Sequence, residues 1–141
     1  MWRRFFSLEG PLARLYSAFA TLGGKKYIIG GASYPENLVL NDIWSLSFEH
    51  VVWDSTSLDL PGVLWEKIEP QEGTMPHLKA HAAIQVDSTK IFLFGGYNQK
   101  GECTDSTILF DVEKRRVIPF ETKGTKPAPR AFHVKLNKET I

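Results

Sequence analysis

Four histidines and one cysteine are the side chains of this chain that could bind a metal ion or attack a substrate. His77 and His81 have the spacing of a helical metal-binding pair, but Pro76 directly precedes them and disfavours a helix. Cys103 lies in a polar loop without a histidine close in sequence that would activate its thiol. These residues therefore predict no metal site, no cofactor and no catalytic group, and the chain is expected not to be an enzyme.

Two arginines occupy matching positions, because Arg14 follows Pro11 by the same interval as Arg130 follows Pro127. A guanidinium at such a position could line a central channel or bind carboxylates; the alternative is that it pairs with the backbone of its own structural unit. His81 and His133 also occupy matching positions, which predicts a recurring structural hydrogen bond rather than a ligand site.

The composition narrows the class of protein. With 141 residues, 43% hydrophobic and 23% charged, the chain is typical of one globular domain. Its net charge of +1 provides no basic surface for a nucleic acid, and no apolar stretch approaches the roughly 18 residues of a membrane span. Cys103, as the single cysteine, excludes an internal disulfide and favours a cytoplasmic location. Organellar import is the alternative, since residues 1–6 are basic and aromatic, although Gly10 and Pro11 interrupt any amphipathic helix there.

Regular spacing of glycine, proline and tryptophan indicates an internal repeat. Two apolar runs end in glycine pairs, and each pair follows a proline by the same interval: Pro11 with Gly30-Gly31, and Pro76 with Gly95-Gly96. A Gly-x-x-Pro motif recurs at 73–76 and 124–127. At one fixed interval before Gly10, Gly73 and Gly124 stand Trp2, Trp65 and Arg116.

Each repeat contains four short segments typical of β-strands and none with helical periodicity. In the first unit they are 17–22, 27–29, 43–48 and 65–69, with Gly23-Gly24 forming a tight turn. In the second they are 81–86, 91–94, 107–110 and 117–122. The chain is therefore expected to be all-β, with four-stranded units resembling propeller blades.

These motifs resemble kelch repeats. The shared pattern is Pro-x-x-Arg-x-x-His before the first strand, an apolar run ending in Gly-Gly, an Asn-Asp pair opening the third strand, and a late tryptophan. The matching segments are 127–133, 76–81 (one residue shorter), 11–17 (serine in the histidine place), Asn41-Asp42, Thr104-Asp105, Trp2 and Trp65. Arg116 departs from the tryptophan position. The residues expected to be structural in the repeat are Gly30, Gly31, Gly95, Gly96, Trp2, Trp65, His81 and His133.

The resemblance implies an incomplete kelch-like β-propeller. Residues 2–8 would be the last strand of a preceding blade, 11–70 blade one, 76–122 blade two and 127–141 the start of a third. Closed propellers typically have four to eight blades, so two complete blades and two partial ends leave open edges. The chain is then a fragment of a longer propeller, self-associates to complete one, or is a subunit held by a larger assembly.

Members of the kelch family commonly act as non-catalytic interaction modules, and this implies a scaffold or adaptor that binds protein partners. Variable loops and an insertion at 49–62 supply the candidate partner-binding residues: Tyr34, Glu36, Asn37, Trp53, Leu58, Tyr97, Asn98 and Lys100. The insertion either folds onto its own blade or docks on another chain. Two alternatives are a portion of a kelch-type propeller enzyme with a metal site at the central channel, and a purely structural peripheral subunit.

Overall fold

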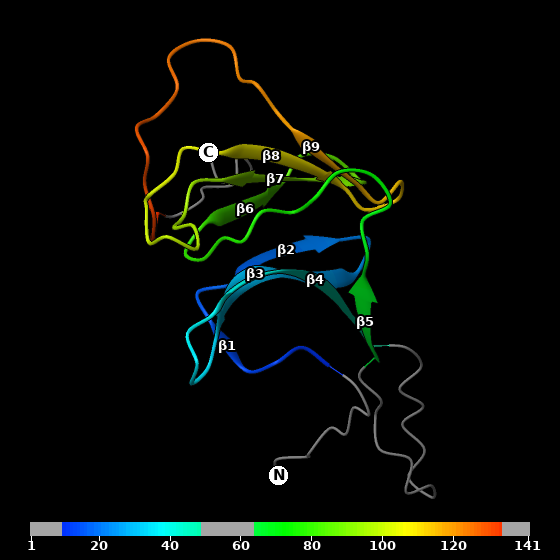
Figure 1. Ribbon diagram of the computed structural model, residues 1–141. Helices are drawn as coiled ribbons and strands as arrows, with labels where there is room; N and C mark the ends of the chain where they lie inside the picture. Colours follow the sequence, from blue (N-terminus) through cyan, green and yellow to red (C-terminus); the bar gives the residue numbers. More distant parts are fainter. Residues whose placement is uncertain (1–9, 49–63, 134–141) are drawn as a thin grey trace, which may run out of the picture.

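The computed structural model describes residues 10–48 and 64–133, and these form nine β-strands in two antiparallel sheets without a helix (Figure 1). The predicted all-β class is confirmed. The predicted strand 2–8, Trp2, and the insertion 49–62 with Trp53 and Leu58 lie outside the described residues.

The first sheet contains five strands. They are β1 (Arg14–Leu15), β2 (Ala18–Leu22), β3 (Lys25–Ser33), β4 (Val39–Ser47) and β5 (Leu64–Ile68). Both β1 and β2 pair with β3, β1 near its end and β2 near its start, so together they form one interrupted edge strand. The interruption occurs at Tyr16, whose φ of 59° is incompatible with a continuous strand.

The second sheet repeats this order with four strands. They are β6 (Ala82–Gln85), β7 (Lys90–Phe94), β8 (Thr107–Asp111) and β9 (Arg116–Pro119), paired in sequence order. In place of a separate first strand, Lys79 bridges to Tyr97. Each sheet is thus a simple meander in which neighbouring strands are joined by the connections that the sequence predicts.

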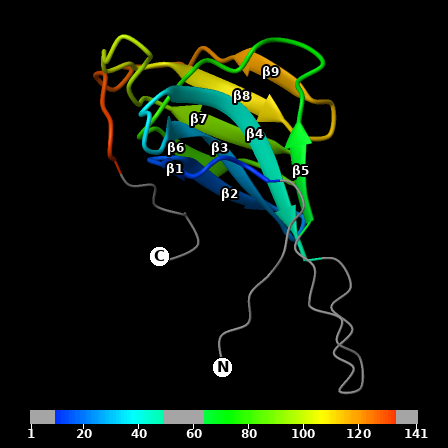
Figure 2. The same cartoon turned by 60° about the horizontal axis from the view of Figure 1, so that its bottom comes forward.

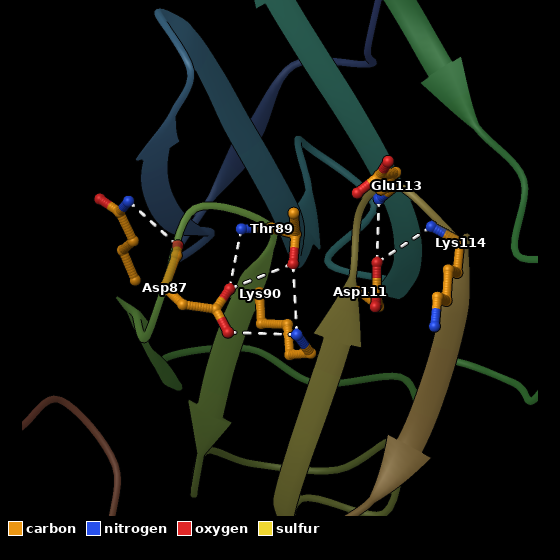
Figure 3. A network of polar contacts seen from close by, with 7 residues as sticks. Asp87, Thr89, Lys90, Asp111, Glu113 and Lys114 are labelled. Atoms are coloured by element: carbon orange, nitrogen blue, oxygen red, sulfur yellow. Dashed lines mark hydrogen bonds and ion pairs between the residues drawn. The ribbon is translucent and has the colours of Figure 1, made fainter.

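Tight turns join the strands at one end of the sheets. Gly23 and Gly24 both have positive φ (54° and 78°), as the predicted two-residue turn requires. In the second sheet, carboxylates take this role (Figure 3): Asp87 accepts hydrogen bonds from Thr89 N at 2.8 Å and Lys90 Nζ at 3.1 Å, and Asp111 accepts from Lys114 N at 2.9 Å. This polar network holds two hairpin turns and is structural.

The core lies between the two sheets. Alternate residues of the first sheet point toward the second, among them Ala18, Ile29 and Ile43, and they pack with Leu93 and Phe110 of the second sheet. Leu93 and Phe110 are completely buried. We call the two apposed surfaces the inner faces and the two opposite surfaces the outer faces.

The sheets are arranged like a fan. Strands β2 and β6 make the main strand contact between them, whereas β5 and β9 are well separated in Figure 1; Figure 2 shows the same sheets from another side. The connection after β5 crosses to the second sheet and covers the free edge of β9. Val117 N of β9 donates to Glu72 O of this connection at 2.8 Å. A Cβ on Gly73 would collide with the carbonyl oxygen of Val117, so this crossing needs glycine.

Most repeat landmarks occupy equivalent positions in both sheets, but two predicted matches are wrong by one residue. Trp65 pairs with Leu46 as Val117 pairs with Phe110, and Gly10 lies against Trp65 as Gly73 lies against Val117, so the counterpart of Trp65 is Val117 and not Arg116. The predicted match of Asn41-Asp42 with Thr104-Asp105 is also wrong by one residue. Leu40 O accepts from Leu78 N and Thr104 O accepts from Arg130 N, both at 3.2 Å. These matching bonds align Thr104 with Leu40, so the counterpart of Asp42 is Ser106.

Candidate interaction surface

The glycine pairs hold each unit to the one that follows. Gly31 N donates to Leu78 O at 2.8 Å, and Gly96 N donates to Arg130 O at the same distance. Gly30 has a φ of 59°, and a Cβ there would lie 2.5 Å from Leu78 O. Glycine is therefore required both for the left-handed backbone and for the close approach of the next unit. The predicted structural role of these pairs agrees with this geometry.

The histidines of the repeat pack on these glycines. The Cε1 atoms of His81 and His133 lie 3.1 and 3.0 Å from the positions that a Cβ would take on Gly30 and Gly95. The predicted recurring hydrogen bond is absent among the described residues: Nδ1 of His81 and both ring nitrogens of His133 are buried without a partner. The imidazole serves as a flat spacer between units.

Burial has an electrostatic consequence for both rings. Desolvation, with a smaller contribution from His133, lowers the pKa of His81 to about 4. The pKa of His133 is also lowered, by burial and then by the positive charge of Arg130. Both rings are therefore neutral at pH 7, as an apolar packing role requires.

A backbone ladder runs across three successive units beside the inner strands. Phe132 N donates to Ala80 O at 3.0 Å, and Ala80 N donates to Tyr16 O at 2.8 Å. All three residues have left-handed φ values, 59° at Tyr16, 56° at Ala80 and 55° at Phe132. Left-handed backbone costs roughly 1–2 kcal/mol for a residue other than glycine. The ladder and the packed sheets hold these residues in conformations that they disfavour in isolation.

Arg14 has a structural role. Its guanidinium donates to both carboxylate oxygens of Asp42, at 2.5 and 2.9 Å, and to Gly30 O at 3.1 Å. The arginine side chain is 6% exposed. Burial opposes ionisation of Asp42, but hydrogen bonds from Arg14 and Trp44 outweigh it and lower the pKa of that carboxyl. The charge of Arg14 is therefore paired inside its own unit, which favours the structural alternative over the channel-lining one.

Arg130 matches Arg14 in its local geometry but not in its partner. Nε of each arginine donates to the carbonyl two residues earlier, Leu12 at 3.0 Å and Ala128 at 3.2 Å. Arg130 itself is exposed. In the second unit Leu78 takes the arginine position and Ser106 takes that of Asp42, so both members of the ion pair are replaced together.

Three aromatic rings gather beside the ladder. The rings of Tyr16 and Phe132 meet edge to face with centroids 5.2 Å apart, and Tyr97 lies 6.1 Å from Phe132. Tyr16 is 50% exposed and Phe132 is 63% exposed. Aromatic side chains that are fixed yet open to solvent supply contact area with little loss of entropy on binding.

The predicted partner-binding loops lie at the same end of the sheets as these rings. Lys79 connects them: its backbone pairs with Tyr97, and its Nζ donates to Asn37 Oδ1 at 3.4 Å. Tyr34 is 65% exposed, and Glu36 and Lys100 are also exposed. We call this end, formed by residues 12–16, 33–38, 79–80, 97–102 and 128–133, the loop edge. In Figure 1 it lies to the left of the sheets.

Asn98 differs from the other candidates because its side chain is used internally. Its Oδ1 accepts from Lys100 N at 2.9 Å and Glu102 N at 3.0 Å, and its Nδ2 donates to Glu102 at 3.0 Å. Asn98 therefore stabilises the conformation of the 97–102 loop. The side chains of its neighbours are the ones available to contact a partner.

Sequence reasoning missed several members of the loop edge. The exposed apolar residues that it did not single out there are Leu12, Leu15, Tyr16, Leu38 and Phe132. A signal existed for two of them, since Tyr16 and Phe132 both directly precede the histidine place of the repeat. Their exposure depends on left-handed backbone, which no local pattern predicted.

No group of three or more histidine, cysteine or acidic side chains is arranged to hold a metal ion within 10–48 and 64–133. In the same ranges no helix is long and apolar enough to cross a membrane.

The chain is similar to segments of much larger proteins. No family model matches it. It is 26% identical over 136 residues to the Dynein alpha chain, flagellar outer arm, of Chlamydomonas reinhardtii, covering 94% of this chain and 3% of that protein. It is 31% identical over 120 residues to tRNA wybutosine-synthesizing protein 2/3/4 of Arabidopsis thaliana, covering 84% and 10%. It is 27% identical over 126 residues to N-(sulfonatooxy)prop-2-enimidothioate sulfolyase of Thlaspi arvense, covering 87% and 32%. The chain thus spans at most about a third of the length of these relatives.

Proposed function

We propose that this chain forms two adjacent blades of a kelch-type β-propeller and that its loop edge binds a protein partner without catalysis. The aromatic surface of the loop edge is the observation that carries the proposal. Two of its rings, Tyr16 and Phe132, stand on left-handed backbone that the fold holds in place and that the chain would otherwise avoid.

The contacts between units support the propeller. The same elements meet in the same sense from one unit to the next: glycine pair to carbonyl, histidine to glycine, and ladder residue to ladder residue. Contacts that recur in this way describe one rotation applied repeatedly, and a fan of four-stranded meanders with β2 and β6 innermost is the arrangement of propeller blades.

The side chains of the loop edge support protein binding. Large exposed apolar residues concentrate there, including Leu12, Tyr34, Leu38 and Phe132, each more than 60% exposed. Tyrosine and other aromatic residues contribute most to binding energy when a partner covers them. Neighbouring charges of both signs, such as Glu36 and Lys100, would form a polar rim.

The relatives point in the same direction. They include a dynein alpha chain, a tRNA wybutosine-synthesizing protein and a sulfolyase, whose names describe different functions. Similarity that recurs across such different proteins follows a structural module more readily than a shared reaction.

The experiment compares two matched substitutions on opposite ends of the sheets. Tyr34→Ala removes a 65% exposed ring from the loop edge, and Val86→Ala removes a 58% exposed side chain from the hairpin end. Protein that co-purifies stoichiometrically with the wild-type chain should be lost with Tyr34→Ala and retained with Val86→Ala. Equal retention by both variants would remove the loop edge as the binding surface. Stoichiometric metal with turnover in the purified chain would favour the enzyme alternative.

A further inference from the structure

We propose that this chain binds a second copy of itself head to tail, with the outer face of one copy's first sheet packed on the outer face of the other copy's second sheet. In this contact, residues 11–17 of the incoming copy replace residues 127–133 of the receiving copy. The inference rests on the proposed propeller arrangement, because it extends the sheet-to-sheet contact seen within the chain.

The outer face of the first sheet has the same register as a surface that the fold buries. Strand pairing places Ile28, Trp44 and Leu46 at the positions that Leu93, Ile108 and Phe110 occupy in the second sheet. The latter three are 0%, 5% and 0% exposed because the first sheet covers them. Ile28, Trp44 and Leu46 are partly exposed, and a groove of about 230 Å³ lies beside Ile28 and Leu46.

The outer face of the second sheet is the complementary surface. Ala82, Ile84 and Phe94 occupy the positions of Ala18, Ala20 and Ile29, the inner-face residues of the first sheet that cover the second. These three are partly exposed and line an apolar groove of about 370 Å³, together with Phe92 and His133. One copy therefore presents both halves of an interface that is already formed once inside it.

Residues 127–133 stand in the way of direct docking, next to Thr122, Lys123 and Thr125 on the same groove, but residues 127–133 are exchangeable. Three backbone hydrogen bonds hold them: Gly96 N to Arg130 O, Arg130 N to Thr104 O, and Phe132 N to Ala80 O. In the first unit, Arg14 and Tyr16 occupy the backbone positions that Arg130 and Phe132 occupy in the third. Tyr16 has nearly the same φ as Phe132, 59° against 55°. Incoming residues 11–17 can therefore remake each bond that is lost.

Burial of apolar surface is the term that drives this association. Replacing backbone hydrogen bonds one for one changes little, whereas covering apolar surface contributes about 25 cal/mol for each Å² removed from water. Residues 11–17 keep their internal contacts as they dock, because Arg14 pairs with Asp42 of its own sheet and Ala13 O accepts from Tyr34 N. The two faces differ, so the contact is heterologous and each dimer keeps one free face of each kind.

Analytical ultracentrifugation of the full chain tests the proposal with one charge placed in each face. Leu46→Lys (first sheet) and Ile84→Lys (second sheet) should each weaken association by roughly 30-fold, as expected when an interface residue worth about 2 kcal/mol is lost. Ser88→Lys, in the exposed turn between β6 and β7 and outside both faces, should leave association unchanged.

Mixing the two variants gives the decisive result. Each keeps one intact face, so an equimolar mixture of Leu46→Lys and Ile84→Lys should form a one-to-one complex and nothing larger. A mixture that stays monomeric overturns the proposal, as does association that only one of the two substitutions weakens, since that outcome indicates a symmetric contact. Wild-type chain that is monomeric up to roughly millimolar concentration also overturns it.

Two further variants secure the interpretation. If circular dichroism shows that Leu46→Lys does not fold, Thr21→Lys takes its place, because Thr21 is exposed and lines the same groove. Phe132→Pro removes the N–H that donates to Ala80 and forbids the left-handed φ, so it loosens residues 127–133. It should strengthen association by roughly fivefold if one such bond is worth about 1 kcal/mol; weaker association would exclude the exchange. Tyr34 belongs to neither face, so failure here leaves the test of partner binding intact.

Discussion

Gly30 must be glycine for two reasons, its left-handed backbone and the close approach of the second unit. Comparing Gly30→Ala with Gly23→Ala separates these two contributions to stability. Gly30 and Gly23 have nearly the same φ, 59° and 54°. A Cβ on Gly23 would meet no atom within 4 Å, whereas one on Gly30 would lie 2.5 Å from Leu78 O and 3.1 Å from Leu40 O. Gly23→Ala therefore measures the cost of left-handed backbone alone, and Gly30→Ala adds the cost of pushing the second unit away.

The expected losses follow from these contacts. Gly23→Ala should lower the free energy of unfolding by about 1 kcal/mol, the cost of an alanine in the left-handed region. Gly30→Ala should lower it by about 2–4 kcal/mol, since overpacking against rigid backbone costs a further 1–3 kcal/mol. The collision also displaces the bond from Gly31 N to Leu78 O, which joins the two units.

Urea unfolding followed by tryptophan fluorescence measures both losses, at a protein concentration low enough to keep the chain monomeric. Circular dichroism before unfolding confirms that both variants keep their β-structure. Equal losses from the two variants would refute the reasoning, because they would show that the second unit does not approach Gly30 closely enough to exclude a methyl group.

Two further predictions concern buried polar groups. Because the folded pKa of His81 is about 4 and its ordinary value is 6.5, the neutral ring is favoured in the folded state. This stability is complete above pH 6.5 and is lost as the pH falls toward 4, on the order of 3 kcal/mol in total. Urea unfolding of His81→Gln against pH should show a flatter slope in that window, and an unchanged slope would contradict the assignment. Arg14→Leu leaves the Asp42 carboxylate without its buried cation and should cost about 3–5 kcal/mol. Adding Asp42→Ser, which reproduces the Leu78 and Ser106 combination of the second unit, should recover most of this loss; additive losses in the double-mutant cycle would contradict the pairing.

Much of the fold could be predicted from residues close together in the sequence. The strands follow from short apolar runs bounded by turn residues, and the Gly23-Gly24 turn adopts the positive φ values that such a pair permits. The equivalence of Arg14 and Arg130 also came from their spacing alone, and their matching bonds to nearby carbonyls agree with it.

Contacts between units could not be read in the same way. The match of Asn41-Asp42 with Thr104-Asp105 was wrong by one residue because loop lengths before the third strand differ, and only the pairing across units reveals the register. The predicted histidine hydrogen bond was wrong for a related reason: the partner of His81 is the bare face of Gly30 in the preceding unit, which no neighbouring residue indicates.

The amino-acid sequence alone determined the strand order, the repeat and the positions where glycine must stand, because these depend on local backbone preferences and on periodic burial. Tertiary structure decided what those positions touch. It brought Tyr16, Tyr97 and Phe132 together, buried Arg14 on Asp42, and left one apolar face open on each sheet. Those outcomes depend on how one twisted sheet stacks on the next, and stacking is set by contacts between residues that are distant in the chain.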